Sequence, residues 1–300
     1  MIRVGTDCAG IEAPIQALIN LKIPFDHVFS CEKDEHCQES IKANYSPHYI
    51  YDDITTRNVN DIPDIDLYVC GFPCQPFSSA GKRRGTREKK GQIFWYCVDV
   101  IRIKKPTFFI LENVKGLLTI GNGKTFETII DKLEELGMYD IHYEVLDTKD
   151  YGIPQHRERL FIIGIKSELH HPFSFFDIRH KPLRSVHSFI DHSNQESDEI
   201  PPYLKRSGLL KRIPKDAAFI DVGFTQNNFP NSNLVSPSLT TCGNLWCVPY
   251  KRKATVKEML KLQHFPTDFN QVVSDRQMKK QIGNSISVNV LEEIFKLLFL

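Results

Sequence analysis

The stretch Ile65-Asp66-Leu67-Tyr68-Val69-Cys70-Gly71-Phe72-Pro73-Cys74-Gln75-Pro76-Phe77-Ser78 joins an apolar run to a proline-flanked turn that holds a cysteine. The run at 65–69 predicts a buried strand. In an open α/β sheet, ligands bind just beyond the carboxyl ends of the strands, so a thiol at Cys74 would be placed for chemistry. Most free cysteines are small buried hydrophobes, however, and this stretch alone leaves both interpretations open.

Two further segments place polar side chains next to predicted strands. The apolar run at 107–111 predicts a second buried strand and leads into Glu112-Asn113-Val114, and Gln155-His156-Arg157-Glu158-Arg159 precedes a third apolar run at 160–164. The strand edges would thus supply a thiol, a carboxylate and two guanidinium groups. Glu112 also suits the N-terminus of a helix, and the Arg-Glu-Arg run also suits a salt-bridged surface.

Together these elements resemble those of a cytosine-C5 DNA methyltransferase, of the compact microbial or viral kind that belongs to restriction-modification systems. The elements Pro-Cys-Gln at 73–75, Glu-Asn-Val at 112–114, Gln-x-Arg-x-Arg at 155–159 and Gln-Ile-Gly-Asn-Ser at 281–285 follow one another in that family's order and spacing. The resemblance covers nearly the whole chain apart from about 170–235. Four elements in register are a far more specific signal than any one of them.

The first half of the chain alternates strand-like and helix-like patterns, which predicts an α/β fold with a doubly wound, mostly parallel sheet. Strands are expected at 2–7, 25–32, 49–54, 65–70, 107–112 and 159–165, and helices at about 15–21, 35–44, 92–104, 124–137, 257–263 and 288–298. The resemblance implies the Rossmann-like fold of S-adenosylmethionine-dependent methyltransferases. It also implies a catalytic, cofactor-binding domain at 1–175 and 276–300, and a smaller irregular target-recognition domain with a hinge at 176–275.

The composition is that of an ordinary globular protein, with 300 residues and a formal net charge of +1. Any surface that attracts nucleic acid must therefore be local. We expect neither a signal peptide nor a membrane span, because no apolar run is long enough to cross a bilayer. The scattered cysteines indicate neither a disulfide framework nor a metal site, and they favour a reducing, intracellular compartment. The resemblance implies the cytoplasm of a bacterial or viral system. We expect a monomer.

The resemblance assigns catalytic roles to five residues, namely Cys74, Gln75, Glu112, Arg157 and Arg159. The Cys74 thiolate would add to C6 of a flipped-out cytosine, a methyl group would pass from S-adenosylmethionine to C5, and elimination would restore the ring. Glu112 would stabilise N3 and accept from the N4 amine, which selects cytosine over thymine. Arg159 would hold the base O2 and help to place Cys74, while Arg157 would contact backbone or phosphate.

The implied cofactor is S-adenosylmethionine, held by the loop after the first strand and by the ends of neighbouring strands. The expected contacts are Asp7, Cys8, Ala9, Gly10, Ile11, Glu32, Lys33, Asp53, Ile54, Pro73, Ile93 and Asn284. The family's first loop generally carries more glycines, where this chain has Glu12 and Ala13, and often an aromatic residue, where it has Cys8. Lys33 stands where an apolar or aromatic side chain is common. These departures bear on cofactor affinity rather than on its identity.

The segment 82–91 carries the densest positive charge of the chain. Charge runs are usually solvated loops. Its place after the Cys74 turn favours a mobile lid that closes over DNA phosphates and holds the flipped nucleotide. The expected DNA contacts are Ser78, Lys82, Arg83, Arg84, Arg87, Lys89, Lys90 and Asn113. The element at 236–241 would anchor the recognition domain, and the framework helix would begin near residue 257.

The leading hypothesis is thus a DNA (cytosine-5)-methyltransferase that acts on double-stranded DNA with a short target site, alongside a cognate restriction endonuclease. One alternative keeps the chemistry but changes the substrate to tRNA or another RNA. Another is a non-catalytic DNA-binding homologue, which would be expected to lose Cys74, Glu112 or Arg159. A Rossmann dehydrogenase is the weakest alternative, because the chain lacks the full glycine fingerprint.

Overall fold

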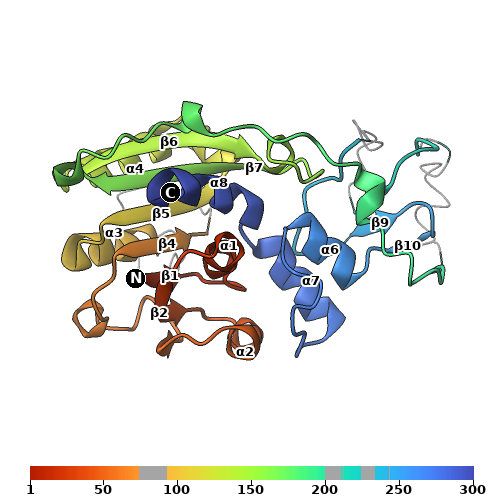
Figure 1. Cartoon of the computed structure of the whole chain (residues 1–300), viewed down its shortest axis with the longest axis horizontal. Helices are drawn as coiled ribbons and strands as arrows, with labels where there is room; N and C mark the ends of the chain where they lie inside the picture. The colour runs from red at the N-terminus through yellow and green to blue at the C-terminus, as the bar shows by residue number, and fades with distance from the viewer. Residues whose placement is uncertain (74–92, 200–210, 212, 224–233, 243) are drawn as a thin grey trace.

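The computed structural model describes residues 1–73, 93–199, 211, 213–223, 234–242 and 244–300 (Figure 1). The strands are β1 (Ile2–Asp7), β2 (Phe25–Cys31), β3 (Tyr49–Tyr51), β4 (Leu67–Gly71), β5 (Phe108–Val114), β6 (Tyr139–Asp147), β7 (Glu158–Lys166), β8 (Phe219–Asp221), β9 (Leu245–Cys247) and β10 (Arg252–Lys253). The α-helices are α1 (Ala13–Leu21), α2 (Glu35–Asn44), α3 (Ile93–Lys104), α4 (Lys124–Glu134), α6 (Val256–Leu262), α7 (Asp275–Asn284) and α8 (Val288–Phe299).

The large sheet has seven strands in the order β3-β2-β1-β4-β5-β7-β6. The pairs from β3 to β5 are parallel, whereas β7 runs antiparallel to both β5 and β6. The reversal of strand order beside β1 creates the crevice where open α/β sheets bind ligands. The predicted α/β class with a mostly parallel sheet is confirmed.

The longest elements that the sequence did not predict are β6 and α7, and the short strands β8, β9 and β10 were not located either. β6 lies at the sheet edge, and its exposed positions include Asp140 and Glu144, which obscure an apolar strand pattern. α7 is mostly polar and buries only four of its residues, namely Met278, Gln281, Ile282 and Gly283. Both elements are stabilised by packing in the folded chain, and neither has a strong local sequence pattern.

Helices cover both faces of the large sheet (Figure 1). α1 and α8 pack on one face in an apolar cluster that includes Leu18 and Phe295. α3 and α4 pack on the other face, where Phe94 and Ile129 join a second cluster. The first cluster continues into the later part of the chain through residues such as Met259 of α6.

That later part contains a small three-stranded antiparallel sheet in the order β10-β9-β8, with α6 and α7 beside it (Figure 1). α6 begins with a capping box in which Thr255 and Glu258 satisfy each other's backbone amides. Glu258 also pairs with the buried Arg252, with Nη2 2.8 Å from Oε1. The end of α7 touches the segment that precedes β9, because a Cβ on Gly283 would lie 2.3 Å from the carbonyl oxygen of Thr240.

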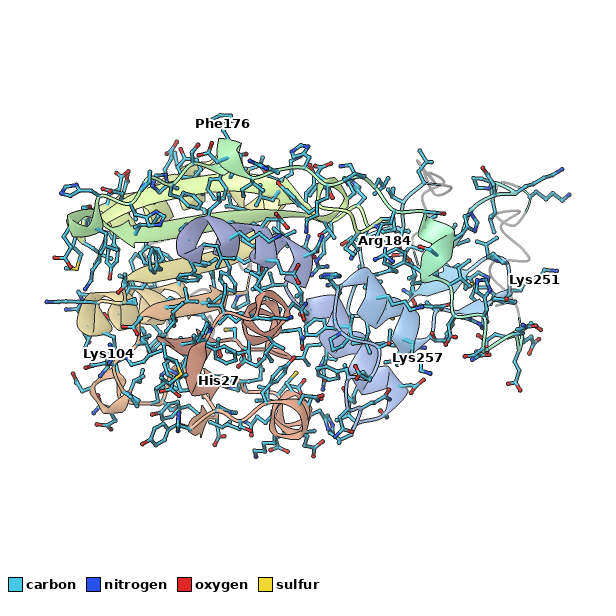
Figure 2. All side chains as sticks on the ribbon, in the orientation of Figure 1. His27, Lys104, Phe176, Arg184, Lys251 and Lys257 are labelled. Carbon is cyan, nitrogen blue, oxygen red and sulfur yellow. The ribbon has the colours of Figure 1, made fainter. Side chains whose placement is uncertain are left out.

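Long charged side chains such as Lys104 and Lys257 project from the ribbon in Figure 2. Phe176 is 97% exposed, which is unusual for a large apolar side chain. Among the helices that the structure describes, none is long and apolar enough to cross a membrane.

Candidate active site at the carboxyl edge of the sheet

Three neighbouring strands bring their polar residues to one edge of the sheet. β4 and β5 are parallel, so their carboxyl ends meet there, with Gly71 opposite Glu112. β7 is antiparallel, so its first residues lie at the same edge, with Arg159 opposite Val114. The residues that precede β7 therefore lie at the same edge of the sheet as the residues that follow β4 and β5.

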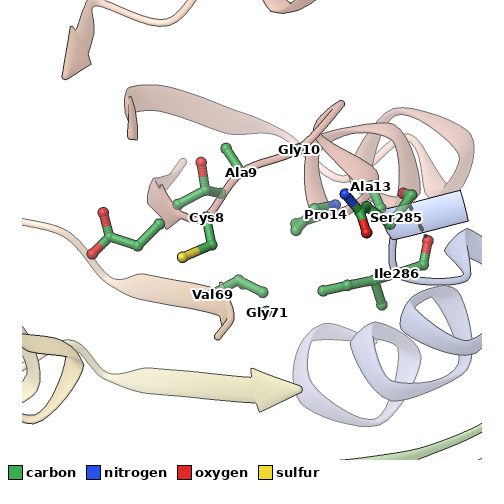
Figure 3. A pocket seen from close by; sticks show the side chains of 12 residues that line it. Cys8, Ala9, Gly10, Ala13, Pro14, Val69, Gly71, Ser285 and Ile286 are labelled. Atoms are coloured by element: carbon green, nitrogen blue, oxygen red, sulfur yellow. Dashed lines mark hydrogen bonds between the residues drawn. The ribbon is translucent and has the colours of Figure 1, made fainter. Parts of the chain in front are cut away.

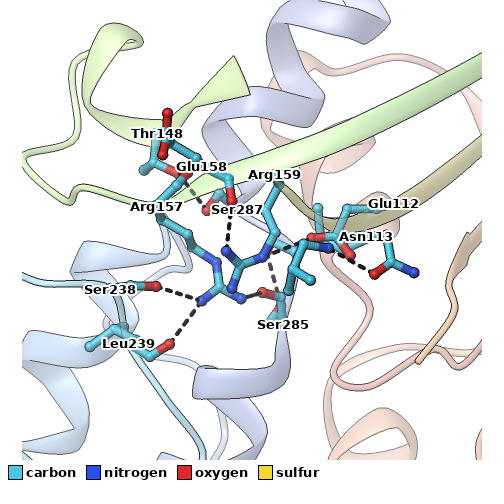
Figure 4. A network of polar contacts seen from close by, with 12 residues as sticks. Glu112, Asn113, Thr148, Arg157, Glu158, Arg159, Ser238, Leu239, Ser285 and Ser287 are labelled. Atoms are coloured by element: carbon cyan, nitrogen blue, oxygen red, sulfur yellow. Dashed lines mark hydrogen bonds and ion pairs between the residues drawn. The ribbon is translucent and has the colours of Figure 1, made fainter. Parts of the chain in front are cut away.

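Glu112 and Arg159 form an ion pair at this edge, with Arg159 Nε 3.2 Å from Glu112 Oε1 (Figure 4). Their side chains are 11% and 18% exposed. Arg159 Nη1 also donates to the carbonyl of Glu158 at 2.8 Å. Burial raises the pKa of Glu112, and Arg159 and Arg157 partly oppose this rise. The carboxyl is thus held close to a cation and keeps its proton to a higher pH than a free glutamate.

Arg157 lies next to this pair but is buried, with only 2% exposure. Its guanidinium donates to the carbonyl oxygens of Leu239 at 2.8 Å and Ser285 at 2.7 Å (Figure 4). It also donates to the carbonyl of Gly283 at 3.2 Å. Burial lowers the pKa of Arg157, and the charge of Arg159 lowers it further. Of the two contacts expected from the sequence, the structure provides the one to the backbone and leaves these donors occupied.

The loop before β7 is fixed by buried polar side chains. Gln155 is fully buried; its Oε1 accepts from the Leu239 amide at 2.9 Å and its Nε2 donates to the carbonyl of Leu262 at 2.7 Å. The carboxylate of Asp147 accepts from the Arg157 amide at 2.9 Å. Residues 236–239, the start of the predicted anchoring element, are thereby held against the loop that carries the arginines.

Asn113 is buried behind the edge rather than turned to the outside. Its Nδ2 donates to the carbonyl of Phe72 at 2.9 Å, and its Oδ1 accepts from the Val114 amide at 2.9 Å. The structure therefore gives Asn113 a part in shaping the turn after β4, and its contact with DNA stays a prediction.

Several predicted residues lie outside the described part of the chain. They are Cys74, Gln75, Ser78, Lys82, Arg83, Arg84, Arg87, Lys89 and Lys90. The structure describes the chain up to Pro73, which is exposed, and again from Ile93 at the start of α3. The thiol and the basic segment therefore remain predictions.

A pocket opens beside this edge, between the loop after β1 and the end of α7 (Figure 3). Most of the residues that line it are small, as follows: Thr6, Asp7, Cys8, Ala9, Gly10, Ala13, Pro14, Val69, Gly71, Asn284, Ser285 and Ile286. Gly10 has a φ of +58°, and nothing lies within 4 Å of the position a Cβ would take there. Such a loop lets a ligand approach the backbone closely.

The sequence matches the family described as C-5 cytosine-specific DNA methylase over residues 6–233 and 243–299. The chain belongs to this family. It is 38% identical over 277 residues to the Type II methyltransferase M.HaeII of Haemophilus aegyptius, covering 89% of this chain and 84% of the relative. It is 34% identical over 280 residues to M.NgoBI of Neisseria gonorrhoeae, covering 90% and 85%.

A further relative of the C-5 cytosine-specific DNA methylase family is longer. The Type II methyltransferase M.BsuFI of Bacillus subtilis is 35% identical over 276 residues, which cover 89% of this chain but 65% of the relative. Solved structures share the fold. That of Schizosaccharomyces pombe Dnmt2 superposes with a TM-score of 0.75 at 18% identity, covering 99% of this chain and 98% of the other. A mutant of Spodoptera frugiperda DNMT2 gives 0.74 at 19% identity, with full coverage of both chains.

The remaining cofactor residues expected for a methylase of this family do not line the pocket itself. Glu32 accepts from the amides of Gly10 and Asp34 at 2.8 and 2.9 Å. Burial raises the pKa of Glu32, although these hydrogen bonds oppose the rise. Asp53 pairs with the exposed Lys33, with Nζ 2.5 Å from Oδ2. That pair lowers the pKa of Asp53 although partial burial opposes it.

Three of the expected cofactor residues contribute differently. Ile11 and Ile54 are buried in the two apolar clusters, so their side chains pack rather than face the pocket. Asp7 lines the pocket but directs Oδ2 to Arg57 Nη2 at 2.5 Å and to the Tyr68 hydroxyl at 2.6 Å. Its Oδ1 has no hydrogen-bond partner among the described residues.

Sequence reasoning in this methylase missed four buried polar residues, namely Glu12, Arg57, Gln155 and Gln263. Gln263 Nε2 donates to the carbonyls of Ile282 and Ser285, so it braces the turn that follows α7. Two of these residues could have been found from the sequence, since Gln155 lies inside the Gln-x-Arg-x-Arg element and Glu12 stands where the family generally has glycine. Nothing in the sequence points to Arg57 or Gln263, because their partners lie far away in the chain.

Proposed function

We propose that this chain is a DNA (cytosine-5)-methyltransferase that uses S-adenosylmethionine. The observation that carries the proposal is the Glu112–Arg159 ion pair beside the end of the strand that leads to Cys74. Membership of the C-5 cytosine-specific DNA methylase family supports the same reaction. The substrate would be double-stranded DNA with a short target site. The relatives named Type II methyltransferases support a place in a restriction-modification system with a cognate endonuclease.

The reaction requires that C5 of cytosine become nucleophilic. In the proposed mechanism the Cys74 thiolate forms a bond to C6, and the displaced electron pair is accommodated at N3. Glu112, whose pKa is raised by burial, donates a hydrogen bond or a proton at N3, and its other oxygen accepts from the N4 amine. Loss of the C5 proton to a base and release of the thiolate complete the cycle after methylation.

Arg159 would serve as the contact to the base O2. Its guanidinium is partly exposed, and its Nε is engaged with Glu112, so it can present the remaining donors to a base that enters the edge. Arg157 is a positioning residue in this scheme. Its three backbone contacts hold residues 239, 283 and 285 around the edge without touching the substrate.

The residues around the pocket fit S-adenosylmethionine. Gly10 leaves open space above the loop, and Glu32, which accepts from the Gly10 amide, offers a carboxylate to ribose hydroxyls. Asp53 offers an acceptor for the adenine amine once Lys33 gives way, and Asn284 lines the pocket from α7. When bound, the cofactor supplies an electrophilic methyl group. We further propose that residues 1–175 and 276–300 form the catalytic domain and residues 176–275 the recognition domain.

The test is methyl transfer from tritiated S-adenosylmethionine to duplex DNA, with tRNA as a parallel substrate and bisulfite sequencing to locate the product. We expect label in DNA at cytosine C5, none in Cys74→Ser, and a stable complex with DNA that contains 5-fluorocytosine at the target. Transfer to tRNA alone would favour the RNA alternative. Undiminished transfer by Cys74→Ser would refute the mechanism.

A further inference from the structure

A fully buried carboxylate lies beneath the loop after β1. Glu12 has no exposed surface and adopts a left-handed backbone conformation, with φ 61° and ψ 50°. Its Oε1 accepts from the Thr6 hydroxyl at 2.6 Å and from the Ser30 hydroxyl at 2.5 Å. His27, labelled in Figure 2, places Nε2 3.4 Å from the same oxygen.

This arrangement is costly unless it serves a purpose. A non-glycine residue in the left-handed region is strained, and a carboxylate without exposure loses its hydration. Partners of Oε1 on two strands offset part of this cost, since Thr6 belongs to β1 whereas Ser30 and His27 belong to β2. The other oxygen, Oε2, has no hydrogen-bond partner among the described residues. The side chain thus connects both strands to the loop between β1 and α1.

The same loop forms one side of the pocket. Thr6, which donates to Glu12, lines the pocket, and so do Ala13 and Pro14, which follow Glu12 at the start of α1. The Glu12 amide also donates to the carbonyl of Ala9 at 2.9 Å, which closes the turn around Gly10. Glu12 therefore contacts both Thr6 before the loop and Ala9 within it, and it directly precedes the start of α1.

We propose that Glu12 is a positioning residue for the cofactor: its carboxylate fixes the β1–α1 loop in the conformation that binds S-adenosylmethionine. This inference rests on the proposed function, because it takes the pocket to be the cofactor site. Glu12 does not line the pocket, so it acts through Thr6, Ala9 and the start of α1.

Three substitutions separate the parts of this role. Glu12→Gln keeps an oxygen that can accept from Thr6 and Ser30. Glu12→Gly loses these bonds but relieves the left-handed strain, and Glu12→Ala loses the bonds and keeps the strain. Glycine is ordinarily less stabilising than alanine next to a helix, so a glycine variant that melts above the alanine variant would report the backbone requirement directly.

The measurement is the dissociation constant for S-adenosylmethionine by calorimetry, with the melting temperature of each variant. We expect Glu12→Ala to weaken binding by about tenfold or more, and Glu12→Gln by less than about threefold, since hydrogen bonds to a charged acceptor are the stronger ones. Glu12→Gly should fall between them. In turnover assays the loss should fall mainly on KM for the cofactor rather than on kcat.

The matched control is Glu258→Gln, because Glu258 is equally buried but caps α6 and pairs with Arg252 away from the pocket. It should lower the melting temperature and leave cofactor binding unchanged. A Glu12→Ala protein that binds the cofactor within twofold of the wild type would overturn the inference. A wild-type chain that binds S-adenosylmethionine but methylates no nucleic acid would refute the proposed function and leave the binding comparison intact.

Discussion

The two ends of the functional edge are constructed differently. At the end formed by β4, β5 and β7, side chains meet directly, and Glu112 and Arg159 are held as an ion pair. At the β1–β2 end, the pocket is lined mainly by small residues of β1 and its following loop, of β4 and of 284–286, and the loop is held from below by Glu12. The first end depends on which side chains are present, whereas the second depends on the path of the main chain.

The difference predicts that mutations at the two ends affect different steps. Changes at the β5–β7 end should reduce chemistry and leave cofactor binding intact, while changes at the β1–β2 end should do the reverse. A single substitution that damages both equally would break the distinction.

The largest effect is expected for Glu112→Gln. The amide cannot supply a proton at N3, so kcat should fall by about a hundredfold to a thousandfold. The dissociation constant for S-adenosylmethionine should stay within about twofold, because Glu112 does not line the pocket. Single-turnover methyl transfer and calorimetry on the same preparation measure the two quantities.

Arg157→Ala should act on stability. It removes a buried guanidinium and leaves the carbonyls of Leu239 and Ser285 without their donor, which we expect to cost about 3 kcal/mol in the free energy of unfolding. Urea denaturation measures this change. Arg102→Ala, which breaks an exposed pair with Asp99, is the control and should cost less than about 0.5 kcal/mol. Equal losses for the two variants would show that the Arg157 contacts contribute little.

Arg159 should shift the pH dependence of the reaction. Burial raises the pKa of Glu112 and the charge of Arg159 opposes that rise, so removing the charge should raise the pKa further. Activity that needs a protonated Glu112 is present below this pKa and is lost as the pH rises through it. The descending limb of kcat/KM should therefore move to higher pH in Arg159→Gln.

Arg159→Lys keeps the positive charge and provides the comparison. Its descending limb should stay near that of the wild type even if its activity is lower, since lysine lacks the planar donors. A limb that moves to lower pH in Arg159→Gln would contradict the electrostatic account.

The smallest effect is expected for Lys33→Ala. Lys33 is highly exposed and pairs with Asp53, the acceptor assigned to the adenine amine. Exposed pairs are weak, so freeing Asp53 should tighten cofactor binding by less than about threefold. Lys22→Ala, on the exposed end of α1 away from this pair, should change nothing. Weaker binding by Lys33→Ala would mean that the lysine itself contacts the cofactor.

The sequence predicted the β5–β7 end well because its polar residues lie in short motifs directly beside the strands. Glu112 and Arg159 follow and precede apolar runs that are easily recognised as strands, and the structure brings them into contact. What the sequence could not supply was the direction of β7, because an apolar strand reads the same whichever way it runs. That direction decides that the residues before the strand, and not those after it, reach the edge.

The β1–β2 end was predicted less completely for a physical reason. Asp7 carries the expected residue type, yet its carboxylate is turned to Arg57 and Tyr68, which are distant in sequence. Glu12 is recognisable only as a departure from glycine, and its partners Thr6 and Ser30 become neighbours only when β1 and β2 pair. Buried polar contacts of this kind depend on tertiary proximity that no local pattern records.

The close approach of Gly283 to Thr240 sets a rule for redesigning target choice in the proposed recognition domain. The contact is between main chains, so no rotation of a side chain can relieve a larger residue at that position. A chimera that imports another protein's DNA-reading loops would have to retain residues 239–241 together with Gly283. The junction of such a graft should therefore lie before Leu239 in the sequence, so that the native contact between Thr240 and Gly283 is kept.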